Sequence, residues 1–371
     1  MKRVVISKQR IMKRIKSILL LASALLCGAF FTACNDDEDS PVFPQSEETN
    51  YDMSGFAKGA DVSWLTEMEN SGYRFYNAQG EDTECMELLR SLGMNAIRLR
   101  VWVNPGEDVF GWCNKNDLLV KAWRAQKLGF RLMIDFHYSD TWADPSNQTK
   151  PAGWENYTLE ELKTAIADHT KDVLGLLKAN GINNVEWVQV GNETHAGMLF
   201  PTGNTNQEGG MSNFAQMINA GYDAVKEIYP DAKVIVHLDQ GNVASLYNRI
   251  FSGLKANQAK WDIIGMSLYP NMMPDSGEPD NWEQMNNDCI ANMKALIAEY
   301  NTPVIICEIG VNWNYDGAED FFTDFMTKAK QVDQCLGVFT WEPECYQGWK
   351  GYHKGMFDDA GKPTQAFNAF K

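Results

Sequence analysis

At residues 185–195 the sequence reads Val185-Glu186-Trp187-Val188-Gln189-Val190-Gly191-Asn192-Glu193-Thr194-His195. The first part of this run is apolar and β-prone, and it stops at a Gly-Asn-Glu turn that places an amide and a carboxyl side chain at the C-terminal end of a predicted strand. A second run, Pro303-Val304-Ile305-Ile306-Cys307-Glu308-Ile309-Gly310, is also typical of a buried strand that ends on a glutamate. If both strands belong to one parallel barrel, Glu193 and Glu308 face each other across its mouth.

Strand-like segments with helix-like segments between them can be found on both sides of these runs. The predicted strands are residues 56–61, 95–101, 130–136, 186–190, 233–237, 263–267, 304–308 and 336–340. The predicted helices are a first one ending at 86–92, then 117–128, 158–179, 211–228, 244–255, 282–300, 321–331 and 364–370. The third helix begins with a capping box of Thr158 and Glu161. This alternation over about 315 residues predicts an α/β fold, a (β/α)8 TIM barrel in a single catalytic domain over residues 53–371, rather than a doubly wound sheet.

Residues 1–52 are interpreted as an export signal and a tether. Seven basic side chains precede the apolar run 18–31, as in a secretory signal peptide over residues 1–33, and that run is too short for a comfortable membrane span. It ends on Phe31-Thr32-Ala33-Cys34, which resembles the lipobox of bacterial lipoproteins, with Cys34 as the lipidated residue. The acidic run that follows within residues 34–52 is either a plain solvated linker or a surface-export signal of the kind found behind some lipidated cysteines. We expect an exported lipoprotein, anchored in the outer membrane through Cys34 and exposed at the cell surface.

Composition restricts the class of partner. The chain is 44% hydrophobic and 12% aromatic, enough for a large core. Without the signal, 26 basic side chains stand against 49 acidic ones, a net charge of −23, which argues against nucleic acid and favours a neutral substrate. Export permits disulfides, but sequence alone does not pair the six later cysteines, and Cys307 and Cys335 fall in predicted strands as small core residues. The sequence has no CxxC pair and no histidine spacing typical of metal ligands, so we predict no metal and no cofactor.

Polar and aromatic side chains gather just after the predicted strands. In barrel enzymes the C-terminal ends of the strands and the loops that follow them form the active face. The residues in such positions are Trp64, Trp102, His137, Trp142, Asn192, Glu193, His237, Tyr269, Glu308, Trp313, Trp341 and Glu342. We therefore expect the functional site at this end of the barrel.

Glu193 and Glu308 are the candidate catalytic pair. An Asn-Glu pair after a strand also occurs at a helix N-cap, but a second strand-terminal glutamate favours catalysis. Retaining glycoside hydrolysis needs one protonated carboxyl to assist the leaving oxygen and one ionised carboxylate to attack the anomeric carbon, about 5–5.5 Å apart. In this interpretation Glu193 is the general acid/base and Glu308 is the nucleophile.

Arg98 and Arg100 lie two residues apart on the second strand, so both side chains leave the same face and turn into the barrel. An arginine there either holds a nearby catalytic carboxylate ionised and oriented or forms a structural ion pair with Asp61 or Asp135. The sequence leaves both interpretations open.

His137 and His237 also have two interpretations. Each could hydrogen-bond a sugar hydroxyl or a catalytic carboxyl, or be a core histidine whose hydrogen bonds are internal. The tryptophans must be divided between the core and the site. Those in polar, loop-like sequence after strands offer flat surfaces for a sugar ring, and they are Trp142, Trp154, Trp313, Trp341 and Trp349.

Longer motifs extend over the whole domain. They are Lys58-Gly59-Ala60-Asp61-Val62-Ser63, Arg98-Leu99-Arg100-Val101-Trp102-Val103-Asn104-Pro105, Asp135-Phe136-His137-Tyr138-Ser139-Asp140-Thr141-Trp142-Ala143-Asp144-Pro145, Pro151-Ala152-Gly153-Trp154, Val190-Gly191-Asn192-Glu193, Gly265-Met266-Ser267-Leu268-Tyr269-Pro270, Glu308-Ile309-Gly310 and Gly337-Val338-Phe339-Thr340-Trp341-Glu342-Pro343-Glu344. The segment from His137 to Pro145 is the most specific of them. Together they resemble glycoside hydrolase family 53, the endo-β-1,4-galactanases of clan A.

The resemblance implies retaining endo-hydrolysis of β-1,4-galactan in type I arabinogalactan, the side chains of pectin, with galacto-oligosaccharides as further ligands. It implies that Glu193 is the acid/base and Glu308 the nucleophile, that Asn192 holds the sugar 2-hydroxyl and that Tyr269 bonds the nucleophile. The remaining binding or supporting residues would be Arg98, Arg100, His137, Asp140, Trp142, His237, Trp313 and Trp341. Some members carry a calcium site after the seventh strand. The segment 311–317 is short and has a single acid, so we do not transfer calcium to this chain.

Two alternatives share much of this evidence. Another clan A β-glycanase, such as a mannanase or an endo-glucanase, would keep both glutamates and differ in the subsite residues. A surface lipoprotein that only binds glycan would not need a carboxylate pair. We expect the protein to act as a monomer.

Overall fold

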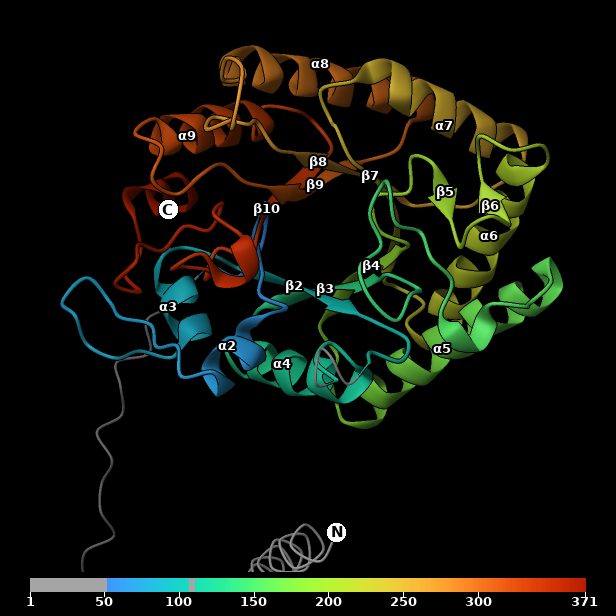
Figure 1. Cartoon of the computed structure of the whole chain (residues 1–371), viewed down its shortest axis with the longest axis horizontal. Coiled ribbons are helices and arrows are strands. Elements are labelled where there is room, and N and C mark those ends of the chain that lie inside the picture. Colours follow the sequence, from blue (N-terminus) through green and yellow to red (C-terminus); the bar gives the residue numbers. More distant parts are fainter. Residues whose placement is uncertain (1–51, 107–110) are drawn as a thin grey trace, which may run out of the picture. The chain divides into compact units, whose positions relative to one another are not determined.

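A computed structural model describes residues 52–106 and 111–371. Its centre is a closed barrel of parallel strands in the order β1-β10-β9-β8-β7-β4-β3-β2, surrounded by helices (Figure 1). This arrangement confirms the predicted (β/α)8 TIM barrel. The predicted signal peptide, Cys34 and the tether up to residue 51 lie outside the described residues.

The barrel strands coincide closely with the predicted ones. They are β1 (Ala57–Asp61), β2 (Ala96–Val101), β3 (Arg131–Phe136), β4 (Val185–Val190), β7 (Lys233–Leu238), β8 (Ile263–Leu268), β9 (Val304–Ile309) and β10 (Cys335–Trp341). The outer helices are α3 (Cys85–Ser91), α4 (Lys115–Lys127), α5 (Leu159–Ala179), α6 (Gly210–Ile228), α7 (Ala244–Ala256), α8 (Trp282–Tyr300) and α9 (Ala318–Ala329). The predicted capping box is present at the start of α5, where Thr158 and Glu161 bond to each other's backbone.

The structure adds short elements between these. They are α2 (Leu65–Asn70), the antiparallel pair β5 (Gly197–Met198) and β6 (Gly203–Asn204), and the 3₁₀ turns η2 (Ala152–Trp154) and η3 (Trp349–Gly351). The predicted closing helix at 364–370 is instead a 3₁₀ helix, η4 (Gln365–Phe370). In a 3₁₀ helix side chains three residues apart lie on one face, and here Phe367 and Phe370 are both buried.

The barrel interior is apolar near the N-terminal ends of the strands and polar near their C-terminal ends. The apolar layer consists of Ala57, Ala96, Met133, Trp187, Ile235, Ile263, Ile305, Cys307 and Phe339. Because side chains alternate along a strand, the next inward positions on β2, β3 and β4 are Arg98, Asp135 and Gln189. A separate and larger apolar core fills the space between strands and helices.

An irregularity in β9 changes the direction of its last side chains. Met266 of β8 pairs with Ile306, but the next residue, Ser267, pairs with Glu308 rather than Cys307. One extra residue in β9 therefore opposes β8, as in a β-bulge, a feature that often re-aims a side chain beside an active site. It allows Cys307 to stay in the apolar layer while Glu308 joins the polar one.

All six cysteines in the described ranges are buried and unpaired, and Cys307 and Cys335 lie in barrel strands as predicted. Among the described helices, none is long and apolar enough to span a membrane.

Candidate active site

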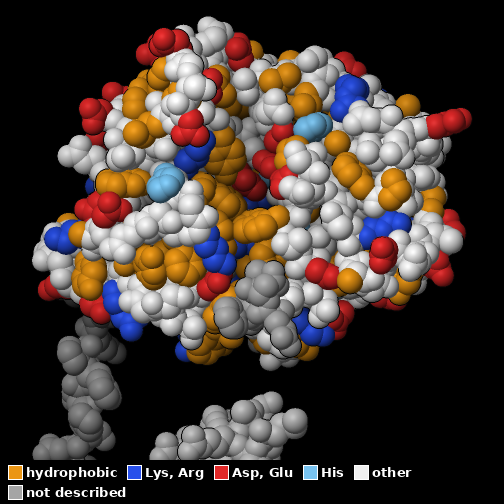
Figure 2. Space-filling view, viewed as in Figure 1, with side chains coloured by type: hydrophobic (Ala, Val, Ile, Leu, Met, Phe, Trp, Pro, Cys, Tyr) orange, Lys and Arg blue, Asp and Glu red, His pale blue; other side chains and the backbone are white. Residues whose placement is uncertain are grey.

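A cavity of about 350 Å³ opens at the C-terminal end of the barrel. Figure 2 shows this face with a hollow near its middle, where acidic side chains lie among hydrophobic ones. The predicted site residues that line the cavity are His137, Trp142, Asn192, Glu193, Tyr269, Glu308 and Trp341. Tyr352 and Lys354, which were not predicted, line it too. Its volume and its mixture of aromatic and polar groups are those of a small-molecule or sugar site.

Glu193 is placed by a turn with left-handed backbone. Gly191 has φ +87° and Glu193 has φ +45°, and a Cβ on Gly191 would lie only 2.7 Å from the Thr194 methyl group, so the turn requires glycine. The turn directs the carboxyl toward β8, where the Ser267 hydroxyl donates to Oε1 at 2.8 Å. Burial raises the pKa of Glu193 well above its usual value, and the charges of Glu308 and Asp239 raise it further. The carboxyl therefore keeps its proton where an ordinary glutamate has lost it.

Glu308 faces Glu193 and has cationic and phenolic partners. Arg98 Nη2 lies 2.9 Å from Oε1, and the Tyr269 hydroxyl donates to Oε2 at 2.8 Å. Burial raises the pKa of Glu308, while Arg98 and Tyr269 oppose this rise by stabilising the ionised form. One carboxyl oxygen of Glu193 and one of Glu308 lie within 4.8 Å of each other. The two carboxyls thus have different proton affinities at a short separation.

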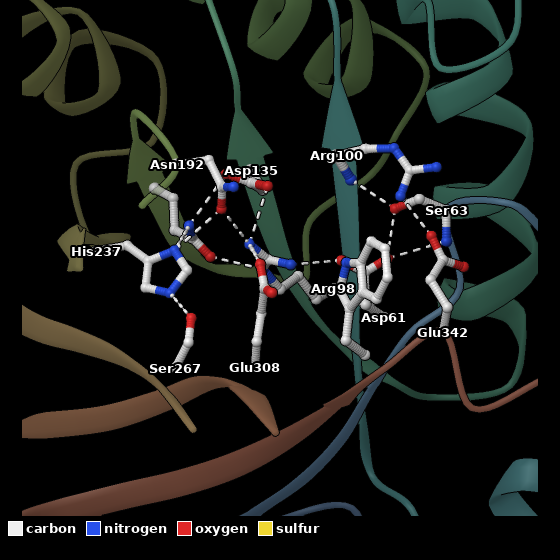
Figure 3. Close-up of polar contacts among 12 residues, drawn as sticks. Asp61, Ser63, Arg98, Arg100, Asp135, Asn192, His237, Ser267, Glu308 and Glu342 are labelled. Carbon is white, nitrogen blue, oxygen red and sulfur yellow. Dashed lines mark hydrogen bonds and ion pairs between the residues drawn. The ribbon is translucent and has the colours of Figure 1, made fainter. Parts of the chain in front are cut away.

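Arg98 is the centre of the polar layer, as Figure 3 shows. It is fully buried, and its Nη1 and Nη2 lie 2.6 and 2.9 Å from carboxylate oxygens of Asp61 and Asp135. Its Nε donates to Gln189 Oε1 at 2.6 Å. One guanidinium therefore forms the structural ion pairs with Asp61 and Asp135 and also contacts Glu308. A buried arginine with five donors in a rigid plane suits this role better than a lysine would.

Arg100 has a different partner. It pairs with Glu342 at the end of β10, and its guanidinium carbon lies 4.4 Å from the ring centroid of Trp142 and 5.1 Å from that of Trp64. Trp142 also meets Trp341 at 5.9 Å between centroids. Cation–π contacts of this kind hold rings in place, so Arg100 supports the aromatic wall of the cavity rather than the carboxylate pair.

His137 and Asn192 link the loop after β3 to the site. His137 Nε2 lies 3.0 Å from Asp135 Oδ2, and its Nδ1 accepts from the Ala143 amide at 3.0 Å. Asn192 donates from Nδ2 to the Ala143 carbonyl at 2.8 Å and accepts on Oδ1 from Arg98 at 2.9 Å. These bonds position the loop that carries Trp142 and fix the Asn192 amide beside Glu193.

Known proteins with similar sequences and structures include glycoside hydrolases. The sequence profile of glycosyl hydrolase family 53 matches residues 57–321. The chain is 34% identical over 316 residues to a probable arabinogalactan endo-β-1,4-galactanase A of Aspergillus fumigatus, covering 78% of this chain and 84% of that one. It is 28% identical over 334 residues to the arabinogalactan endo-β-1,4-galactanase of Thermothelomyces thermophilus, covering 85% and 98%. A solved fungal β-1,4-galactanase superposes with a TM-score of 0.77 at 26% identity, covering 85% and 99%.

This chain belongs to glycosyl hydrolase family 53. The family resemblance predicted from the motifs is thereby confirmed.

Some residues of this family 53 hydrolase that shape the site were not predicted. Gln189 and Ser267 lie in the polar layer. Ser267 is the one polar side chain of β8, and Gln189 is a polar side chain near the C-terminal end of β4, a signal that the sequence does contain. Tyr352 and Lys354 reach the cavity from the loop after β10. Nothing in their local sequence distinguishes them from other loop residues.

Five predicted site residues do not line the cavity, namely Arg98 and Arg100, described above, and Asp140, Trp313 and His237. The Asp140 carboxylate accepts from the backbone amides of Asn104 and Ala152 at 2.9 and 2.8 Å, so it ties two loops together. Trp313 lies outside the cavity lining, and its backbone amide donates to the His353 carbonyl at 3.0 Å. His237 is fully buried beneath the cavity, and burial lowers its pKa well below the usual value.

Two sets of side chains in the described part of the hydrolase have the donor types and spacing of a metal site. In the first set, Glu193, Glu308 and His237 place one ligand atom each within 4.8 Å of one another. Both His237 nitrogens already have hydrogen-bond partners, and a guanidinium contacts Glu308. The second set centres on Glu344, whose pKa is raised well above its usual value by burial and by the neighbouring Glu342. We assign no metal to either set, because donors in both already have partners, and in the second set Glu342 is paired with Arg100.

Proposed function

We propose that this chain hydrolyses internal β-1,4-galactosidic bonds of galactan with retention of configuration. The observation that carries the proposal is the pair of buried carboxyls, Glu193 and Glu308, within 4.8 Å of each other at the floor of an aromatic cavity. Retaining enzymes keep their carboxyls at about 5–5.5 Å, whereas inverting enzymes separate them by about 6.5–9.5 Å to admit a water. The galactanase names of the relatives support galactan as the substrate.

In the first step, Glu308 is the nucleophile. Its carboxylate attacks the anomeric carbon while Glu193 donates its proton to the glycosidic oxygen, so the C–O bond breaks and the leaving sugar departs as an alcohol. Arg98 and Tyr269 keep Glu308 ionised and oriented for this attack. The raised pKa of Glu193 keeps the proton available at pH values where an ordinary glutamate has lost it.

In the second step, Glu193 changes role. Now ionised, it removes a proton from a water molecule, and the water oxygen attacks the anomeric carbon from the face that the leaving sugar occupied. The ester bond to Glu308 breaks, the carboxylate is regenerated and Glu193 recovers its proton. Two inversions at one carbon give net retention.

The cavity suits a neutral sugar. Trp142 and Trp341 present apolar ring surface to the C–H face of a pyranose, and Asn192 presents an amide beside the carboxyls for the 2-hydroxyl. Arg98 and Asn192 are joined by a hydrogen bond, so the amide is already oriented when substrate arrives.

The test is the time course of products from purified mature protein on linear β-1,4-galactan, with mannan and β-glucan in parallel. An early spread of galacto-oligosaccharides, formed first as the β-anomer by proton NMR, is the expected result. Cleavage of mannan or glucan alone would be compatible with the proposed roles of both glutamates but would refute galactan as the substrate. Initial release of the α-anomer would refute the retaining mechanism. Binding of galactan without cleavage would refute the proposal that the chain hydrolyses galactan.

We also propose, from the signal and lipobox patterns, that the mature protein is held on the outer membrane by a lipid on Cys34 and faces the medium. The test compares wild type with Cys34→Ala in cells fed a labelled fatty acid. We expect label and outer-membrane fractionation only in wild type, with the domain removed from intact cells by external protease. An unlabelled wild-type protein in the soluble fraction would refute the anchor, and protease resistance would refute surface exposure.

A further inference from the structure

A closed circuit of hydrogen bonds connects the proposed acid/base to two side chains that do not line the cavity. Ser267 Oγ donates to Glu193 Oε1 at 2.8 Å. His237 Nε2 lies 2.8 Å from the same serine oxygen. The backbone amide of Glu193 returns to His237 Nδ1 at 3.4 Å. Figure 3 shows His237 above Ser267 on the side of the polar layer where Asn192 and Glu308 lie.

The direction of every bond in this circuit follows from Arg98. A guanidinium can only donate, so the Gln189 oxygen must be the atom that faces Arg98 Nε at 2.6 Å. The Gln189 amide nitrogen then faces Asp135 and His237 Nδ1, each at 3.0 Å. His237 Nδ1 thus receives one N–H from Gln189 and a second from the backbone of Glu193, whereas only Asn192 Oδ1, at 3.0 Å, could accept a proton from it.

Two donors against one acceptor place the proton of His237 on Nε2. With that proton directed at Ser267 Oγ, the serine oxygen acts as acceptor toward the histidine and its own hydrogen is free for Glu193. In the opposite tautomer, Ser267 would have to donate to both His237 Nε2 and Glu193 Oε1, but a hydroxyl has one hydrogen. The tautomer of a fully buried histidine therefore sets what Ser267 can do.

We infer that Ser267 and His237 are positioning residues that keep Glu193 Oε1 as a hydrogen-bond acceptor, so that the catalytic proton resides on Oε2. The inference rests on the proposed role of Glu193. The hydrogen bond to Oε1 is retained whether Glu193 is protonated or ionised, so neither step of the reaction requires the circuit to rearrange. The Arg98 guanidinium thus orients Glu193 indirectly, through Gln189, His237 and Ser267, and it contacts Glu308 directly.

The circuit predicts a specific change in the pH profile. The groups whose charge acts on Glu193 are Glu308 from β9, Asp239 after β7 and Arg98 from β2, while His237 is neutral. Ser267→Ala leaves those charges in place and removes a bond that favours the ionised carboxyl. The basic limb of the kcat/KM profile, which reports the acid form of Glu193, should therefore move to higher pH by about one unit.

The experiment compares wild type, Ser267→Ala, Ser267→Thr and the control Ser139→Ala, a buried serine after β3 that is not in the circuit. The substrates are galactotetraose and a dinitrophenyl β-galactobioside, whose leaving group needs no proton. For Ser267→Ala we expect kcat/KM on galactotetraose to fall about tenfold with a shifted basic limb, and a change of less than about threefold on the aryl substrate. In Ser267→Thr the basic limb should return to its wild-type position, and Ser139→Ala should have the wild-type pH profile.

The outcomes separate the two proposals. Wild type that cleaves neither substrate refutes the proposed function, whereas active wild type with an unmoved limb in Ser267→Ala refutes the circuit alone. Equal losses on both substrates would indicate a structural role and also refute it. If Ser267→Ala does not fold, nitrogen-15 NMR of wild type can show which ring nitrogen of His237 carries the proton. The His237 signals are assigned as those that are missing from the spectrum of His237→Gln. A proton on Nε2 supports the inference, and a proton on Nδ1 overturns it.

Discussion

Removing the Tyr269 hydroxyl is expected to raise the pKa of Glu308 without disturbing the barrel. The phenol donates to Glu308 Oε2 at 2.8 Å, and this bond opposes the rise in pKa that burial causes. A hydrogen bond to a charged group contributes about 1.5–3 kcal/mol, and one pKa unit corresponds to about 1.4 kcal/mol. In Tyr269→Phe the pKa of Glu308 should therefore rise by about one to two units.

The assay is the pH dependence of kcat/KM on galactotetraose. Its acidic limb reports the ionisation of the nucleophile, because only the carboxylate attacks. Loss of the hydrogen bond favours the protonated form, so the limb should move to higher pH and activity should fall most on the acid side. At the optimum, kcat should fall about 10-fold to 100-fold, as expected for a lost transition-state contact.

The matched control is Tyr229→Phe, which removes a phenol that donates to the Ile182 carbonyl at 2.8 Å. Its acidic limb should coincide with that of wild type. A Tyr269→Phe enzyme whose acidic limb is unmoved, with normal thermal unfolding, would refute the claim that this hydroxyl stabilises the ionised Glu308. A limb that moves to lower pH would refute the sign of the argument.

Five other substitutions have expected outcomes. Glu308→Ala should lose about 10⁴-fold in kcat on galactan, and Glu193→Ala about 10²–10⁴-fold but far less on a dinitrophenyl substrate; activity within a few-fold of wild type in either would contradict the assignment. Trp187→Ala should lower the free energy of unfolding by about 3–5 kcal/mol in urea titrations, because this ring is buried inside the barrel, and a loss below about 1 kcal/mol would disagree. Burial lowers the pKa of His169 to about 4, so the unfolded state binds the extra proton. The contribution of neutral His169 to the free energy of unfolding is then fully present above about pH 6.5, and this free energy falls by up to about 3 kcal/mol as the pH is lowered toward 4. In His169→Phe the free energy of unfolding should depend less on pH over this range. Lys354→Met should raise KM for galactotetraose several-fold with little change in kcat, because this lysine lines the cavity without contacting either carboxyl; an unchanged KM would remove it from substrate binding.

The periodicity of the strands was sufficient to predict the barrel and the bounds of its strands to within a residue or two. This succeeded because parallel barrel strands are buried on both faces, so each is an apolar run with sharp ends. The predicted position of the site at the C-terminal ends followed from the same pattern. The short elements α2 and β5–β6 were missed because fewer than seven residues carry too little periodicity to be recognised.

The direction in which Glu308 points could not be predicted from alternation. Ile305 and Cys307 face the apolar layer, and strict alternation would therefore have turned Glu308 outward. The extra residue in β9 corrects this, and nothing in the local sequence announces it. The separate partners of Arg98 and Arg100 were equally unpredictable, since two arginines on one face of a strand look alike until neighbouring strands are placed.

The amino-acid sequence by itself determined the class of fold, the end of the barrel that carries the site and the two glutamates proposed for catalysis, because these depend on local periodicity and on residue type at strand ends. Only the tertiary structure decided that one guanidinium joins β1, β2, β3, β4 and β9. The same holds for the direction in which the pKa of each carboxyl is shifted and for the tautomer that we infer for His237. Proton affinity depends on burial and on charges from residues far apart in the chain, and those distances exist only after the barrel has closed.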